Sequence, residues 1–333
     1  MRFGYFVPQG WRHDLVGIDP AEHWSTMHGL AAHADRDGSP WESIWVYDHF
    51  HTVPVHSETE ATHEAWSLMS AFAASTSRVR LGQMCTCMAY RNPAYLAKVA
   101  ATVDVISGGR LEMGIGAGWY EHEWRAYGYG FPDAPERLRM LREGVEIMHQ
   151  AWATGRANFS GEHYTVDGAI FQPQPLQEGG IPMWVAGGGE KVTLKIAAKY
   201  AAYTNFYGSP DEFSHKSEVL RGHTDRLGRD FDSIVRSANF NTVIGTSEAD
   251  VAARLERLEA RVAPYLGTGA TRRFIGDYRS HAAIAVGTVD QVIERLLDMK
   301  RRGLGYAIHY FPELAFDTSV LDLYEREVLP ALR

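Results

Sequence analysis

The chain has 333 residues, 45% of them hydrophobic, so it can bury a large core either as one α/β barrel or as two ordinary domains. Its 33 basic and 41 acidic residues are interspersed and leave a net charge of -8, which argues against a nucleic-acid partner. The first residues lack the pattern of a secretory signal, and no apolar run approaches the ~20 residues that a membrane helix needs.

The two cysteines, Cys85 and Cys87, are one residue apart in a predicted strand. Two cysteines this close in an extended strand cannot easily reach disulfide geometry with each other. Two unpaired thiols suit a reducing compartment, so we expect a cytoplasmic protein.

Short β-prone runs alternate with longer amphipathic stretches along the whole chain. The predicted strands are 2–7, 43–47, 80–85, 111–115, 183–185, 202–205, 234–243 and 305–310. The predicted helices are 94–106, 135–154, 190–200, 247–261 and 289–302. Eight strands with helices between them predict an α/β fold, a (β/α)8 TIM barrel.

No Ser/Gly-rich or Pro-rich linker divides the chain, so we predict a single domain over residues 1–333 with insertions at 158–180 and 264–283. The first insertion mixes aromatic residues with turn formers, which favours a hairpin beside the mouth of the barrel. Thr288 is predicted to be the N-cap of the last helix.

The end of the second predicted strand carries a carboxylate and an imidazole together, at Asp48 and His49. Active sites of such barrels lie at the carboxyl ends of the strands. Aromatic residues flank the pair, which favours an acid/base role. The alternative is a pair that only caps the loop.

A zinc site competes for the same segment, because His49 and His51 form a His-x-His pattern and His56 and His63 follow. Hydrolase barrels with that pattern need further ligands at later strand ends. Only His309 lies near one, so no metal is expected.

Two glycine-rich segments follow predicted strands, at 114–120 and 185–191. In the first, alternate glycines let the backbone approach a ligand, and the aromatics behind them could wall a planar ring. In the second, a glycine triplet exposes backbone N–H groups at a helix N-terminus, where a phosphate is favoured. A tight turn without a ligand is the alternative for the triplet, and core packing is the alternative for nearby Met84 and Cys85.

Taken together, these segments resemble the luciferase-like superfamily, most closely its branch of F420-dependent oxidoreductases. The resemblance covers nearly the whole chain in order. Its matching segments are 1–10, 45–50, 91–93, 104–110, 114–120, 187–191 and 287–292.

The resemblance implies a role for each candidate residue. It puts Asp48 and His49 beside the reactive face of the deazaflavin ring, with His49 as proton donor or acceptor and Asp48 orienting it or meeting the cofactor. Met84 and Cys85 fall where the family often has a non-prolyl cis peptide or a bulge that buttresses the ring. The residues implied to line the ring are Ala117, Gly118, Trp119 and Tyr120, and those implied to hold the phosphate are Gly187, Gly188, Gly189 and Glu190.

The implied function is hydride transfer between coenzyme F420 and an unidentified substrate, a small molecule or a modified peptide. Barrels of this family often pair as homodimers, and the sequence leaves the oligomeric state open. The alternatives are an FMN-dependent monooxygenase and a non-catalytic flavin-binding barrel. Sugar-phosphate dehydrogenases of this family place a catalytic Glu near the positions of Gly118 and Trp119, and this chain has none there. A further set of ring-bearing residues could form an aromatic substrate wall or simply pack together. These residues are Trp11, His13, Trp119, Tyr120, Trp124 and Tyr127.

Overall fold

The computed structural model describes every residue except 207, 281–282 and 333, and it forms two compact units. The first unit contains Met1–Glu64, Tyr207–Ser214 and Arg236–Arg333, and the second contains Ala65–Phe206 and His215–Val235. Each unit is described by itself.

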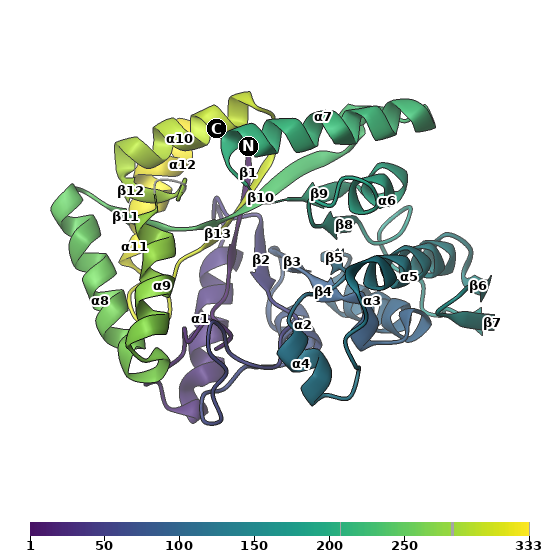
Figure 1. Ribbon diagram of the computed structural model, residues 1–333, viewed down its shortest axis with the longest axis horizontal. Coiled ribbons are helices and arrows are strands. Elements are labelled where there is room, and N and C mark those ends of the chain that lie inside the picture. The colour runs from purple at the N-terminus through teal and green to yellow at the C-terminus, as the bar shows by residue number, and fades with distance from the viewer. Residues whose placement is uncertain (207, 281–282, 333) are drawn as a thin grey trace. The chain divides into compact units, whose positions relative to one another are not determined.

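The first unit is built on a parallel sheet in the order β2-β1-β13-β10 (Figure 1). Its strands are β1 (Arg2–Phe6), β2 (Ser43–Val46), β10 (Val235–Asn241) and β13 (Tyr306–Tyr310). Every residue of β2 and β13 is buried. Strands buried on both faces read as continuous apolar runs, which explains why their sequences do not alternate.

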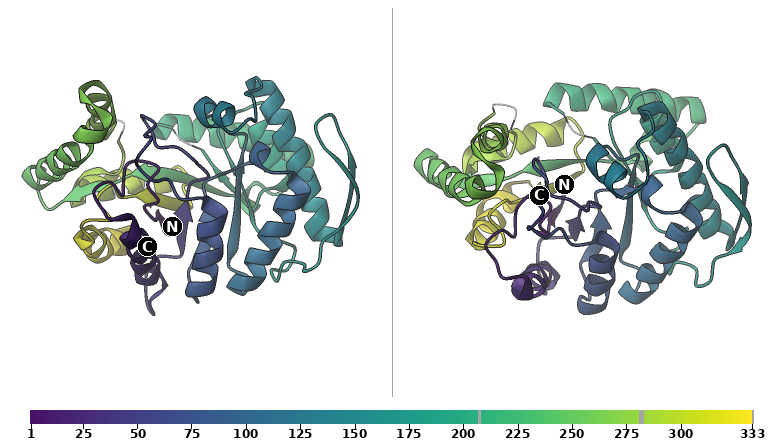
Figure 2. Two further views of the ribbon diagram at one scale, coloured as in Figure 1. Left: turned by 90° about the horizontal axis from the view of Figure 1, so that it is seen from below. Right: turned by 60° about the horizontal axis from the view of Figure 1, so that its bottom comes forward.

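The helices of the first unit pack on strands of that unit or on each other. They are η1 (Pro20–Glu22), α1 (His23–Asp35), α8 (Glu248–Leu266), α9 (Thr268–Arg279), α10 (Val289–Arg301), α11 (Ser319–Leu323), the π-helical turn η4 (Tyr324–Val328) and α12 (Leu329–Leu332). Helices α8 and α9 lie side by side over a small core of their own (Figures 1 and 2). A two-stranded sheet pairs β11 (Val243–Gly245) with β12 (Val286–Thr288), and Thr288 then caps α10 in a capping box, as predicted.

The second unit repeats the parallel pattern, with β5 paired to β3, β4 and β8, and β8 paired to β9. The strands are β3 (Arg80–Gln83), β4 (Thr86–Cys87), β5 (Leu111–Gly116), β8 (Met183–Ala186) and β9 (Tyr203–Asn205). The helices and 3-10 turns are α2 (Ala65–Ser75), η2 (Met88–Tyr90), α3 (Pro93–Ser107), α4 (Glu121–Ala126), α5 (Ala134–Thr154), α6 (Thr193–Tyr200) and η3 (Phe231–Ser233), while α7 covers Pro210–Leu227. The predicted hairpin is present as β6 (Arg156–Ser160) and β7 (Thr165–Ile170), beside α5.

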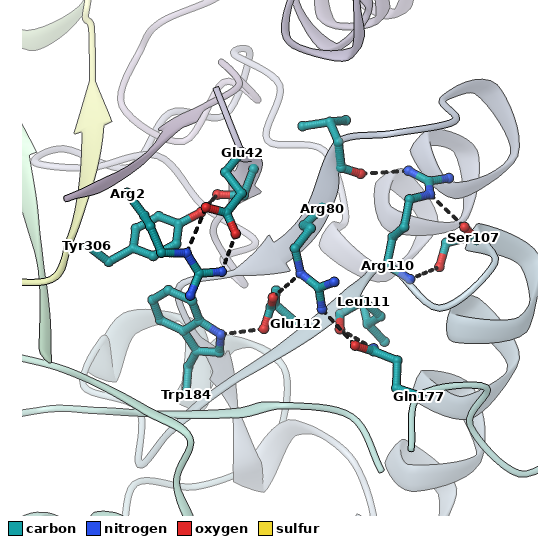
Figure 3. Close-up of polar contacts among 12 residues, drawn as sticks. Arg2, Glu42, Arg80, Ser107, Arg110, Leu111, Glu112, Gln177, Trp184 and Tyr306 are labelled. Atoms are coloured by element: carbon teal, nitrogen blue, oxygen red, sulfur yellow. Dashed lines mark hydrogen bonds and ion pairs between the residues drawn. The ribbon is translucent and has the colours of Figure 1, made fainter. Parts of the chain in front are cut away.

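A buried carboxylate joins three strands of the second unit near their amino ends. Glu112 of β5 pairs with Arg80 of β3 and accepts a hydrogen bond from the indole Nε1 of Trp184 on β8, at 2.6 Å (Figure 3). Arg80 also donates to Gln177, whose amide donates in turn to the carbonyl of Leu111. In barrels, polar networks at the amino ends of strands serve stability, whereas chemistry lies at the carboxyl ends.

All eight predicted strands are observed within one or two residues, but several helices differ from the prediction. The predicted helix 190–200 begins only at Thr193, because residues 187–192 stay in a loop. Helix α8 continues through Pro264 to Leu266, and most of the insertion predicted at 264–283 is helix α9, with residues 281–282 outside the described part. In the described part of the chain, no helix has the length and apolarity to span a membrane.

Candidate active site

The carboxyl ends of β3 and β4 hold a backbone feature that the resemblance implied. The peptide bond between Met84 and Cys85 is cis, and it lies directly after β3. Met84 is buried and Cys85 half-buried, and both cysteines are free thiols, as predicted. The implied cis peptide is therefore present, while its contact with a ring stays a prediction.

The glycine-rich loop after β5 packs against this segment. A Cβ atom added at Gly116 would lie 2.5 Å from Cys85 Sγ, and one added at Gly118 would lie 2.5 Å from Cys87 Sγ. Gly118 also has a φ of +78°, which disfavours other residues. Packing against the two sulfur atoms therefore requires glycine here, in addition to any approach to a ligand.

The aromatic residues considered for a substrate wall separate into two groups. Trp124, Trp11 and His13 are buried, so they pack in the interior of their units. Trp119 is 59% exposed and Tyr127 54% exposed, while Tyr120 is half-buried and stacks on Trp119 at 5.3 Å between ring centroids. Only this second group, together with half-buried Ala117, is available to a ligand.

The glycine triplet forms an exposed loop between β8 and α6. Gly187 has a φ of +117° and donates its N–H to the Asn205 carbonyl, at 2.8 Å. Among the described residues, the N–H groups of Gly188, Gly189 and Glu190 have no hydrogen-bond acceptor. Three free donors just before a helix N-terminus are a suitable environment for a phosphate.

Side chains from α7 hold this loop from one side. Lys216 Nζ donates to the Gly188 carbonyl at 3.3 Å, which brings a positive charge beside the triplet. His215 Nε2 lies 3.0 Å from Glu190 Oε1, and His223 Nε2 lies 2.8 Å from the Glu190 carbonyl oxygen. The carboxylate of Glu190 is thus engaged with α7, and its backbone N–H is the group left for a ligand.

In the first unit, Asp48 and His49 lie just after β2, from which Tyr47 separates them. Asp48 is buried and His49 is half-buried. The His49 ring stacks on the indole of Trp11 with 4.2 Å between centroids and an interplanar angle of 1°. Stacking of this kind fixes the plane of the imidazole.

A partly buried polar cluster in the first unit escaped the sequence prediction. Arg12, in the loop after β1, donates from Nη1 to Asn241 Oδ1 at 2.6 Å. Its guanidinium lies over the Tyr310 ring at 4.5 Å, and Asp14 accepts hydrogen bonds from the Tyr310 hydroxyl and the Gly10 N–H. Burial opposes the charge of Arg12, but the field of Tyr278 and its other polar neighbours outweighs it, so the Arg12 pKa lies above its usual value. A charged residue within an aromatic loop after a strand was the only signal in the sequence.

The histidines considered for zinc have other contacts. His63 Nε2 lies 3.0 Å from His23 Nδ1, and burial together with that neighbour lowers the pKa of His63. His309 lies 2.9 Å from the hydroxyls of both Thr242 and Tyr324, and burial lowers its pKa to about 3.

One other group of potential metal ligands, Glu143, Glu162 and His163, lies in the second unit. The Glu143 carboxylate there accepts three backbone N–H groups, from residues Glu162, His163 and Tyr164. These bonds hold the turn of the β6–β7 hairpin, which accounts for the buried glutamate without an ion.

Comparison with known proteins gives a family match over most of the chain. Residues 1–305 match the model described as luciferase-like monooxygenase. The chain is 34% identical to an F420-dependent glucose-6-phosphate dehydrogenase of Amycolatopsis mediterranei over 48% of this chain and 46% of the relative. It is 29% identical to the pyrimidine monooxygenase RutA of Acinetobacter baylyi over 57% of this chain and 52% of the relative. The chain thus spans about half the length of the first curated relatives that it matches.

A longer match reaches an F420-dependent glucose-6-phosphate dehydrogenase of Nocardia farcinica, 27% identical over 91% of this chain and 93% of the relative. Among solved structures, the monooxygenase RslO1 of Streptomyces bottropensis has a TM-score of 0.81 at 20% identity, with 100% of both chains covered. An F420-dependent secondary alcohol dehydrogenase, solved with an F420-acetone adduct, has a TM-score of 0.78 at 21% identity, with 100% of this chain and 99% of that chain covered. The predicted fold class, a (β/α)8 barrel of the luciferase type, is confirmed.

Proposed function

The chain belongs to the luciferase-like monooxygenase family, and on that premise we propose that it is an F420-dependent oxidoreductase acting on a small organic substrate. Relatives named for F420 occur both among the curated proteins and among the solved structures. Relatives named as monooxygenases occur as well, so the family alone leaves the cofactor open.

The free donors of the glycine triplet carry the proposal of a phosphate-bearing cofactor. Three backbone N–H groups lack acceptors among the described residues, and Lys216 adds a positive charge beside them. An N–H group that has neither water nor another acceptor costs free energy, and the oxygen atoms of one phosphate can accept hydrogen bonds from all three groups. The residues present therefore fit the phosphate of F420, and that of FMN equally well.

When bound, F420 supplies or accepts the hydride, and the protein positions the substrate and handles the proton. We assign the proton to the edge of the His49 ring, whose plane is held by stacking on Trp11. Asp48, buried beside it in the chain, orients the imidazole or meets the cofactor. Met84 and Cys85, with the loop from Gly116 to Tyr120, are the residues we propose as the wall for a planar ring.

The substrate we propose is not a sugar phosphate, although several relatives are named for glucose 6-phosphate. The position at which such relatives are expected to carry a catalytic glutamate is occupied here by Gly118 and Trp119. Gly118 cannot be exchanged freely, because its φ is +78° and a side chain there would meet Cys87 and Trp124. Turnover of glucose 6-phosphate with F420 would contradict this part of the proposal.

Cofactor titration tests the proposal directly. The purified protein should bind F420 at least ten times more tightly than FMN, a difference of about 1.4 kcal/mol. Binding is followed by quenching of cofactor fluorescence, and reduced F420 is then offered with a panel of unsaturated substrates. The reversed order of affinity, with oxygen uptake in the presence of reduced FMN, would identify a monooxygenase. Tight binding of either cofactor without any turnover would support a non-catalytic flavin-binding barrel.

A further inference from the structure

A pocket of about 210 Å³ opens in the first unit beside the end of β10. It is lined by Gly208, by residues 238–241 of β10, by Asp277 and Ser280 around the end of α9, and by Ala283 and Ile284. For scale, an engineered cavity of about 150 Å³ binds benzene, so this pocket has room for a ring with a small substituent. In a barrel enzyme the carboxyl end of a strand is where substrates bind.

Asn241, the last residue of β10, contributes a side chain whose orientation is determined by Arg12. The guanidinium has only donors, so the amide atom 2.6 Å from Arg12 Nη1 must be the oxygen Oδ1. The amide nitrogen Nδ2 therefore points away from Arg12, and it has no acceptor among the described residues. The half-buried side chain offers two N–H donors at the wall of the pocket.

Aromatic rings packed around Arg12 hold its side chain in place beside Asn241. Its guanidinium lies 5.5 Å from the ring centroid of Phe274 and 6.0 Å from that of Tyr278, both on α9, in addition to Tyr310. Among the described residues no carboxylate lies within ion-pair distance of Arg12, although the field of nearby Asp14 favours the charge of Arg12. The Tyr278 hydroxyl is buried and also lacks a partner in the described part of the chain.

The positive charge strengthens the donors of Asn241. A hydrogen bond accepted by an amide oxygen polarises the amide, and such chains strengthen one another by about 10–30% per bond. Asp277 is the one charged residue among the described residues that line the pocket, and it is exposed to solvent, which screens it. The field at Asn241 Nδ2 therefore favours a partner with negative oxygen.

We propose that Asn241 binds a carboxylate or carbonyl oxygen of the substrate and that Arg12 is the positioning residue that aims the Asn241 amide at it. The inference rests on the proposed function, because only an enzyme has a substrate. It restricts the substrates of that enzyme to compounds with a carboxylate or carbonyl oxygen. The pocket's size limits the bound part to about one ring.

Binding of three related probes to the protein without cofactor tests the proposal. Benzoate and benzamide carry the required oxygen, whereas benzylamine has the same ring without it. Benzoate and benzamide should bind the wild type, as measured by NMR titration, and Asn241→Asp should weaken both at least tenfold while improving benzylamine. The carboxylate in this variant would keep an acceptor for Arg12, so the variant is expected to fold.

Asn239→Asp is the matched control, because it adds the same charge to the same pocket two residues earlier. It should leave the affinity for neutral benzamide within about twofold of the wild type. Asn241→Leu removes the donors without adding charge, and it replaces the aspartate variant if that variant is unstable. Its affinity for benzamide should also be at least tenfold lower than that of the wild type. Equal losses in the Asn239 and Asn241 variants, unchanged affinity in the Asn241 variants, or absence of benzoate and benzamide binding by the wild type would each overturn the proposal. None of these results depends on F420, whose binding is measured separately.

Discussion

The carboxyl ends of the strands in the two units present different chemical groups. The candidate groups of the second unit belong to the main chain: glycines packed on sulfur atoms and N–H groups of a glycine triplet. The candidate groups of the first unit are side chains, with His49 on Trp11 and Asn241 held by Arg12. Main-chain sites suit the part of a cofactor that never changes, whereas side chains set the reaction and the substrate.

The strongest test of that contrast is the removal of a side chain. His49→Ala should lower turnover by about 10²–10⁴-fold, the usual effect of losing a general acid or base. Cofactor affinity should stay within a few-fold, because the main-chain groups of the second unit are untouched. Steady-state rates and F420 titration give the two numbers.

His49→Gln is the companion variant, because glutamine forms hydrogen bonds but does not take up a proton near neutral pH. It should lose turnover as much as the alanine variant does. A wild-type rate in either variant, under conditions in which hydride transfer limits turnover, would reduce His49 to a structural neighbour. Tyr120 and Glu121 would be the next candidates for the proton.

The main-chain site should respond to a single added methyl group. Gly118→Ala places a Cβ 2.5 Å from Cys87 Sγ and 2.9 Å from the Trp124 ring, at a φ of +78°. We expect a loss of about 2–5 kcal/mol in the free energy of unfolding, the sum of the left-handed conformation and the overpacking. Gly128→Ala, with a φ of +80° and no neighbouring atom, should lose only about 1–2 kcal/mol. Equal losses by urea unfolding would show that the sulfur contacts do not matter.

The side-chain region should also be the more sensitive to acid. His309 has a pKa of about 3 in the folded protein against 6.5 for an ordinary histidine, because burial disfavours its charged form. The contribution of neutral His309 to the free energy of unfolding is therefore complete above pH 6.5. It is lost as the pH falls from 6.5 toward 3. At pH 4.5 the loss is about 3 kcal/mol, at about 1.36 kcal/mol per pH unit.

His309→Gln keeps one donor and one acceptor for the hydroxyls of Thr242 and Tyr324 but does not titrate. Its free energy of unfolding should vary less between about pH 6.5 and 4 than that of the wild type. Chemical denaturation at several pH values gives both curves, and parallel curves would assign the acid sensitivity to other groups.

The smallest effects are expected at Gly188 of the glycine triplet, where two variants separate the effect of added charge from that of added size. A Cβ at Gly188 would meet only the flexible end of Lys216, at 2.8 Å from Nζ, so Gly188→Ala should change F420 affinity by no more than about threefold. Gly188→Asp should weaken it at least tenfold, about 1.4 kcal/mol, because a carboxylate would face the phosphate. Unchanged affinity in a folded Gly188→Asp variant would remove the loop from the cofactor site.

The sequence predicted the strands and the glycine-rich loops that follow them better than it predicted the contacts of Arg12, for a physical reason. Strands such as Met183–Ala186 are continuous apolar runs, and glycines next to a strand end are visible in the sequence itself. Arg12 is different, because its partner Asn241 is 229 residues later and only the folded chain brings them together.

Several helices escaped the prediction, among them α1, α2 and α7, and the start of α6 was misplaced. Helix α7 is polar along most of its length, so its sequence carries no clear apolar stripe. The start of α6 was predicted too early, because Glu190 and Lys191 favour helices while the preceding glycines keep the chain in a loop. The single-domain organisation and the roles of the site residues stay predictions.

The role of Glu112 affects how the results of random mutagenesis on this protein are interpreted. Its carboxylate joins β3, β5 and β8, and breaking such a buried pair typically costs about 3–5 kcal/mol. A loss of that size lowers the amount of folded protein in a cell, so a screen scored by activity will rank Glu112 and Trp184 with the catalytic positions. Abundance measured beside activity separates them: these variants disappear from the soluble fraction, whereas the His49 variants accumulate as inactive protein.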